Sequence, residues 1–241
     1  VRTPPPPPPP PPAPPPPASK PPPPPPPARK WVYWLSDDFT DPAVDFDLWG
    51  LDTGGKGVSA TEQNGRLEFS VAPDIQTDAT HAVAKHYGTR CLLKGDFDAT
   101  VNFSLLTWPA EDGVHLAFGA WFPPPKENWL SIERIGGTAD GPEYYGSSIA
   151  PAGSSLSDDM SGALRVKRTD GVLSVYYRSG KIWKRFGWKW APDPAALVLM
   201  LWTSDILFGH QAAVAAVDNF NAISDDVVCR GAPLPPRKRR H

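Results

Sequence analysis

Hydrophobic and polar residues alternate with a period of two along much of the chain. In NGRLEFSV, Leu67, Phe69 and Val71 share one side, and polar side chains occupy the other. The segment GDFDATVNFSL repeats the pattern with Phe97, Ala99, Val101, Phe103 and Leu105. This period is typical of β-strands with one buried and one exposed face.

The same pattern predicts further strands in GVHLAFGAWF, WLSIERI, ALRVKRTDGVLSVYYRSG, LVLMLW and AAVAAVDNF. Asp170-Gly171 lies between two alternating runs and predicts a tight hairpin. Turn residues separate nearly all of these segments, and no amphipathic stretch is long enough to predict a helix. We therefore expect an all-β fold, an antiparallel two-sheet jelly-roll sandwich.

The amino-terminal segment has a different composition. The chain contains 33 prolines in 241 residues, and most of them lie in one block before residue 30. Proline fixes φ and lacks an amide donor, so this block predicts an extended polyproline II arm, roughly 75 Å long if straight. We divide the chain into an arm (1–30), a β-sandwich domain (31–229) and a basic, proline-containing tail (230–241).

The domain resembles the concanavalin A-like, laminin-G-like jelly-roll superfamily. The resemblance depends on the order of DDF at Asp37, Trp49, NGRLEF, GDFDATVNF, SIER, SGALRVKRTDGVLSVYYRSG followed by Trp183, and VDNF. It covers nearly the whole domain and implies a jelly-roll fold more than it implies an activity.

The arm is similar in composition to the proline blocks of extensins and of algal wall glycoproteins such as pherophorins. The resemblance implies that its prolines are hydroxylated and carry short sugars. The candidate modified residues are Pro4, Pro5, Pro6, Pro7, Pro8, Pro9, Pro10, Pro11, Pro12, Pro14, Pro15, Pro16, Pro17, Pro21, Pro22, Pro23, Pro24, Pro25, Pro26 and Pro27.

Charge is distributed unevenly. The domain holds all 26 acidic residues against 15 lysines and arginines, whereas the arm and the tail carry only basic residues. The asymmetry could steer the basic end of one copy to the acidic body of another, or it could simply keep the protein in solution. The tail sequence Arg237-Lys238-Arg239-Arg240 is open to three interpretations: a processing site, a nuclear localisation signal, or a solvated basic end.

The two cysteines, Cys91 and Cys229, either form a disulfide that ties the last strand to the body or remain two buried thiols. We favour the disulfide, because Asn102-Phe103-Ser104 is also a glycosylation sequon and both features fit an oxidising compartment. The expected location is therefore outside the cell. No apolar run reaches the 18 to 20 residues of a membrane-spanning helix.

Motifs of known catalytic sites are missing. Glycosidases of this fold carry two carboxylates in the pattern E-x-D-x-x-E, which the chain lacks, as it lacks G-x-S-x-G and H-E-x-x-H. Glu133 in SIER has no carboxylate partner along its strand, so we interpret it as an exposed or arginine-paired residue. We interpret His81 and His86 as ordinary loop histidines. The sequence thus predicts no enzymatic activity and no required cofactor.

A structural calcium ion is the one metal that the fold suggests. Sandwiches of the superfamily often hold one near the chain ends, which makes Asp37, Asp38 and Asp218 the candidate ligands. Aspartates that cap turns at strand ends are the alternative.

Aromatic residues form the most informative set. The ten tryptophans include several that a core does not obviously need. Exposed rings stack on sugars or grip a polyproline helix, and the alternative is packing between the sheets. The candidate carbohydrate- or polyproline-binding residues are Trp121, Trp129, Trp183, Phe186, Trp188 and Trp190.

Four functions are compatible with these features. We favour an extracellular structural glycoprotein, a cell-wall or surface-filament subunit whose partners are other copies of itself and glycans. A carbohydrate-binding module on a proline-rich spacer is the alternative. An intracellular ligand of proline-binding domains and an unrecognised glycan-active enzyme follow. Nothing predicts nucleic-acid binding.

Overall fold

The structure is a computed structural model of the chain. It describes residues 31–54, 57–73, 75, 83–109, 113–124, 128–137, 144–149, 154–203, 212–229, 231 and 234–239. The proline arm and its candidate modification sites lie outside the described residues, as does His81.

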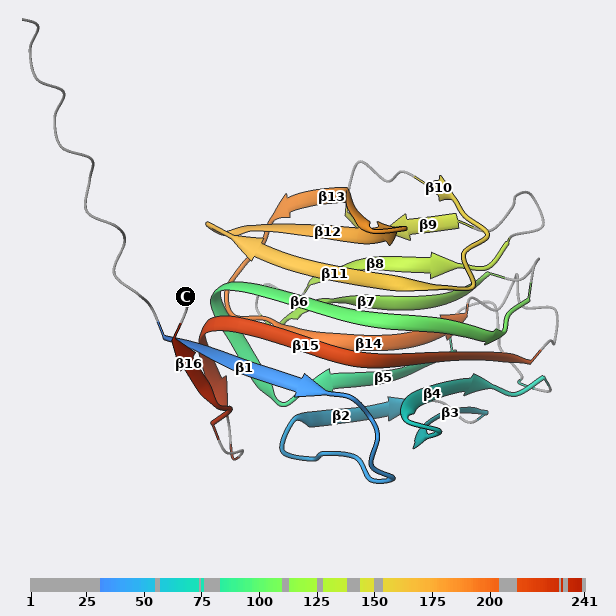
Figure 1. Ribbon diagram of the computed structural model, residues 1–241, viewed down its shortest axis with the longest axis horizontal. Helices are drawn as coiled ribbons and strands as arrows, with labels where there is room; N and C mark the ends of the chain where they lie inside the picture. The colour runs from blue at the N-terminus through green and yellow to red at the C-terminus, as the bar shows by residue number, and fades with distance from the viewer. Residues whose placement is uncertain are drawn as a thin grey trace, which may run out of the picture.

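In the part of the chain that the structure describes, sixteen strands form two antiparallel sheets, which lie face to face in Figure 1. The nine-stranded sheet consists of β13 (Ile182–Trp190), β12 (Val172–Ser179), β11 (Ser161–Thr169), β6 (Cys91–Thr107), β15 (Ala213–Cys229), β1 (Trp31–Asp37) and β16 (Arg237–Arg239) in that order, with β4 (Arg66–Val71) paired to β15 and β3 (Val58–Gln63) paired to β4. The seven-stranded sheet runs β10 (Ser155–Leu156), β9 (Tyr144–Ser147), β8 (Asn128–Ile135), β7 (Val114–Phe122), β14 (Ala196–Thr203), β5 (Val83–Thr89) and β2 (Trp49–Gly54).

The predicted all-β sandwich is confirmed. Every segment with period-two alternation forms a strand, and its apolar side points into the core. Asp170 and Gly171 adopt positive φ angles of 51° and 77° in the turn between β11 and β12, as a tight hairpin requires. No helix that could span a membrane occurs among the residues that the structure describes.

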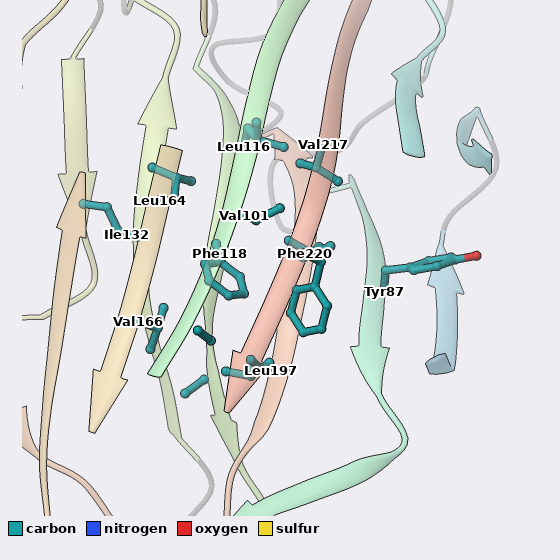
Figure 2. Close-up of a cluster of buried hydrophobic side chains, with 14 of the residues drawn as sticks. Tyr87, Val101, Leu116, Phe118, Ile132, Leu164, Val166, Leu197, Val217 and Phe220 are labelled. Carbon is teal, nitrogen blue, oxygen red and sulfur yellow. The ribbon is translucent and has the colours of Figure 1, made fainter. Parts of the chain in front are cut away.

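The core fills the space between the sheets. Figure 2 shows Val101, Leu164 and Phe220 of the nine-stranded sheet meeting Leu116, Phe118 and others from the seven-stranded sheet. Trp49, the largest fully buried side chain, contacts the rings of Phe39, Tyr87 and Phe220 with centroid distances of 4.8 to 5.8 Å. These interlocking rings fix the two sheets relative to each other.

Cys91 and Cys229 form a disulfide at the end of the β6–β15 pair, with a Cα–Cα distance of 4.3 Å. The basic tail returns to the same sheet, since Arg237–Arg239 pairs with Trp31–Tyr33 of β1.

Candidate functional site

The outer face of the seven-stranded sheet carries a row of polar and small residues. Side chains alternate along each strand, so Leu116, Phe118, Leu130 and Ile132 fill the core and their neighbours point to the opposite face. The strand register aligns Glu133 with Ala117, Ala117 with Met200, and Met200 with His86. Ala117 and Gly119 have little or no side chain, so they project little from the centre of this face.

Glu133 is held by two neighbours at one end of this face. His115 Nδ1 lies 2.8 Å from Glu133 Oε2, and the Ser131 hydroxyl donates to Oε1. The Trp202 ring stacks on His115 with a centroid distance of 3.7 Å. The side chains of His115 and Glu133 are 15% and 8% exposed, so the pair is mostly shielded but still open to one side.

The environment keeps Glu133 ionised. Burial alone raises the pKa of a carboxyl group, but the hydrogen bond and charge of His115 and the hydrogen bond from Ser131 outweigh it and lower the pKa of Glu133. Our interpretation of Glu133 as an exposed or arginine-paired residue is therefore wrong. The sequence did not reveal His115 as the partner of Glu133, because the two residues are 18 positions apart. They come together only because β7 pairs with β8.

A groove of about 550 Å³ lies on the same face. Trp121, Trp129, His86 and Met200 are among the residues that line it. The Trp129 ring lies over Gly119, where an added Cβ would come within 2.7 Å of it. His86 lies in β5 and lines the groove, so our interpretation of it as a loop histidine is wrong. Burial, with the charge of Lys85, lowers the pKa of His86, which favours a neutral imidazole there.

The structure divides the predicted aromatic set into two groups. Trp121 and Trp129 line the groove, whereas Trp183, Trp188 and Trp190 lie on β13 at the edge of the other sheet. Phe186 belongs to neither group, because it packs against the core with its ring 6.1 Å from that of Tyr177.

Of the three predicted calcium ligands, Asp37 and Asp38 line one surface cavity, and Asp218 lines a different one. Asp37 accepts hydrogen bonds from the Phe39 amide at 2.8 Å and from the Trp49 indole at 2.7 Å. Asp38 caps its own turn through Thr40, which lowers its pKa. No group of three metal-binding side chains occurs in the described part of the chain, so calcium binding remains a prediction without a ligand cluster.

Asp218, the third of these residues, accepts a hydrogen bond from the Asn102 side chain at 3.0 Å. Asn102 lies in the middle of β6, on the nine-stranded sheet. Its glycosylation remains a prediction.

Glu62 on β3 is a buried carboxyl that we did not predict. It is 5% exposed, and burial, followed by the charges of Asp37, Asp41 and Asp45, raises its pKa to about 7. The one hint of this raised pKa in the sequence is the number of aspartates between residues 37 and 47. The sequence does not show that they lie near Glu62, because that proximity depends on the fold.

No family model matches the chain, and no curated protein sequence matches it. Solved structures do resemble it. A prokaryotic β-1,3-1,4-glucanase (lichenase) from a mouse hindgut metagenome has a TM-score of 0.56 at 12% identity, over 80% of this chain and 100% of that one. The catalytic domain of an endo-1,3-β-glucanase (laminarinase) from Thermotoga petrophila has a TM-score of 0.56 at 14% identity, over 83% of this chain and 100% of that one. The fold is a concanavalin A-like jelly roll.

A third jelly-roll neighbour is an endo-β-galactosidase from Clostridium perfringens that releases GlcNAcα1-4Gal, with a TM-score of 0.55 at 14% identity over 78% of this chain and 61% of that one. All three neighbours are glycan-cleaving enzymes. Our predictions of a structural filament subunit and of a protein without enzymatic activity are therefore wrong. Identities this low show the fold alone, so an activity has to be argued from the site.

Proposed function

We propose that this protein is a carbohydrate-active enzyme that takes a glycan chain on the outer face of its seven-stranded sheet, with Glu133 as the reactive carboxylate. The observation that carries the proposal is the position of an ionised, largely buried Glu133 on the same face as a groove lined by Trp121 and Trp129. Glycan-cleaving neighbours on the same fold support it.

Each part of the face has a chemical role in this proposal. The rings of Trp121 and Trp129 offer flat apolar surfaces on which sugar rings stack. Glu133, ionised at neutral pH, acts on the anomeric centre either as nucleophile or as the base that activates water. The hydrogen bonds with His115 and Ser131 fix the orientation of the carboxylate.

Hydrolysis of a glycosidic bond also requires an acid that protonates the leaving oxygen. Glu133 is the one carboxylate on the outer face of β7, β8 and β14 among the side chains that the structure describes. A second acid would therefore have to come from the loops around this face or from the substrate.

The test is release of reducing ends from β-1,3-glucan and from mixed-linkage β-1,3-1,4-glucan by the full chain. We expect Glu133→Gln to lower kcat at least 100-fold, and Trp129→Ala to raise KM with a smaller effect on kcat. Glu68→Gln, which changes a glutamate on the opposite sheet, is the matched control. Full activity of the Glu133→Gln variant, or binding of glucan without release of reducing ends, would contradict the proposal.

A further inference from the structure

Positive charge is concentrated in three strands of an otherwise acidic domain. Between residues 161 and 190 lie eight of the 15 lysines and arginines of the domain, but Asp170 is the only acidic residue there. These residues form β11, β12 and β13 at one edge of the nine-stranded sheet (Figure 1). Such a local excess differs from the rest of the domain and calls for its own explanation.

The strand register brings cations and aromatic rings to one face. Arg165 pairs with Tyr176 and Tyr176 with Arg185, while Arg178 pairs with Trp183. Trp188 pairs with Ser174 and Trp190 pairs with Val172, which puts both tryptophans on the same side of the sheet. The intervening residues Leu164, Val166, Leu173 and Val175 are buried in the core, so this set points outward. We call Arg165, Tyr176, Arg178, Trp183, Arg185, Trp188 and Trp190 the Arg-Trp surface.

The Arg-Trp surface already holds one carboxylate. Arg165 binds Asp98 through two nitrogens, with 2.7 Å between Nε and Oδ1, and this contact raises the pKa of Arg165. The guanidinium of Arg165 lies 5.6 Å from the centre of the Trp183 ring, and that of Arg178 lies 5.9 Å from it. Arg178 thus shares the Trp183 ring with Arg165, but no ion pair involves Arg178 in the described part of the chain.

Two of the three tryptophans of this surface are exposed to solvent, whereas core residues are buried. Trp188 is 51% exposed and Trp190 is 68% exposed. The Trp190 ring packs over Gly171 in the β11–β12 turn, where an added Cβ would lie 2.8 Å from it. The ring is therefore supported from beneath and keeps its other face open, as a stacking platform does.

We propose that the Arg-Trp surface binds a polyuronate, a polysaccharide that carries a carboxylate on each sugar. The open faces of Trp188 and Trp190 stack on sugar rings, and Arg178 and Arg185 pair with carboxylates as Arg165 pairs with Asp98. This binding is separate from the groove of the proposed enzyme, because the two surfaces lie on the outward faces of opposite sheets.

Charge favours a polyuronate over the proline arm as the ligand of the Arg-Trp surface. The arm carries four basic residues and no acidic one, so it would bring like charge to this surface. A polyuronate brings the opposite charge. The Asp98 pair shows that carboxylate geometry already fits here, which favours a carboxylated chain over a sulfated one.

The test is binding of the full chain to polygalacturonate, with dextran, dextran sulfate and a synthetic Thr3–Arg29 peptide as comparisons. We expect Arg178→Glu combined with Arg185→Glu to raise the Kd for polygalacturonate at least tenfold, and Trp188→Ala combined with Trp190→Ala to raise it severalfold. The wild-type affinity should fall as salt is added.

Lys189→Glu and Ile182→Ala are the matched controls, because the register turns these β13 residues to the other side of the strand. Trp129→Ala separates this surface from the groove and should leave polygalacturonate binding unchanged. No binding of polygalacturonate, equal loss in the Lys189→Glu control, or equally tight binding of dextran or dextran sulfate would overturn the proposal. Tighter binding of the Thr3–Arg29 peptide would overturn it in favour of the arm.

Discussion

Two charged neighbours on β8, Glu133 and Arg134, point to opposite faces of the sheet and have different surroundings. Glu133 faces the groove side of the sheet, and Arg134 points into the sandwich and is fully buried. Arg134 donates to the carbonyl oxygens of Ile135 at 2.8 Å, Ser157 at 2.9 Å and Asp159 at 3.2 Å. These bonds satisfy N–H donors of the buried guanidinium, which would be costly to bury unpaired. Arg134 therefore stabilises the chain beside the site, whereas Glu133 presents its carboxylate on the groove side.

The raised pKa of Glu62 makes stability depend on pH. Between its ordinary value of 4.5 and about 7, the folded protein holds a proton that the unfolded chain has released. The free energy of unfolding therefore falls as the pH rises through this window and stays lower above it. Asp37, whose pKa burial also raises, acts in the same direction.

Glu62→Gln removes this ionisation, so we expect a higher Tm than wild type at pH 8 and little difference at pH 5. A domain of this size gains about 2 to 4 °C in Tm for each kcal/mol of added stability. Glu68→Gln is the control, because its carboxyl has a lowered pKa instead. Thermal unfolding of the three proteins at both pH values is the measurement. If Tm fell between pH 5 and pH 8 as much in the Glu62→Gln variant as in the wild type, Glu62 would not be the source of the pH dependence.

At the scale of strands, the groove depends on the small residues of β7. An added Cβ at Gly119 would lie 2.5 Å from the carbonyl oxygen of Leu130 and 2.7 Å from the ring of Trp129. Both distances are too short for a packed side chain. The close approach of β7 and β8 therefore requires glycine at this position.

We expect Gly119→Ala to reduce the free energy of unfolding by about 1 to 3 kcal/mol and to displace the Trp129 ring. Gly187→Ala is the matched control, because its Cβ would meet the Ile149 side chain at 3.2 Å, which can move. Denaturant unfolding and tryptophan fluorescence measure the two effects. Equal, small losses in both variants would show that Gly119 is not under this constraint.

The period of two was sufficient to predict most of the sheet but not the site. It placed Leu67, Val101 and Phe103 correctly in the core, because burial on one face of a strand is a local property. The strand Trp31–Asp37 was not predicted, since WVYWLSD has no clear alternation. The Asn64-Gly65 turn between β3 and β4 carries a local hairpin signal that we did not use. The Glu133–His115 contact was also not predicted. Such contacts depend on register, which the spacing of residues along one strand does not determine.

At the scale of the whole molecule, the two longest strands, β6 and β15, pair along the middle of the nine-stranded sheet. Their ends at Cys91 and Cys229 are joined by the disulfide, which closes a loop of 138 residues. That loop contains β7 to β14, and therefore most of the groove and the whole Arg-Trp surface. The crosslink thus restricts the unfolded chain over most of the domain.

Removal of this crosslink should cost about 4 to 5 kcal/mol, the value that chain entropy gives for a loop of this length. We expect Cys91→Ala combined with Cys229→Ala to lower the midpoint of guanidinium unfolding by the corresponding amount, with little change in the native spectrum. A reducing agent should destabilise the wild type to a similar extent and leave the double variant unaffected, which is the internal control. Since β15 already pairs with β6 along its length, the native fold should persist without the bond. A double variant as stable as the oxidised wild type would show that the loop is already restricted in the unfolded chain.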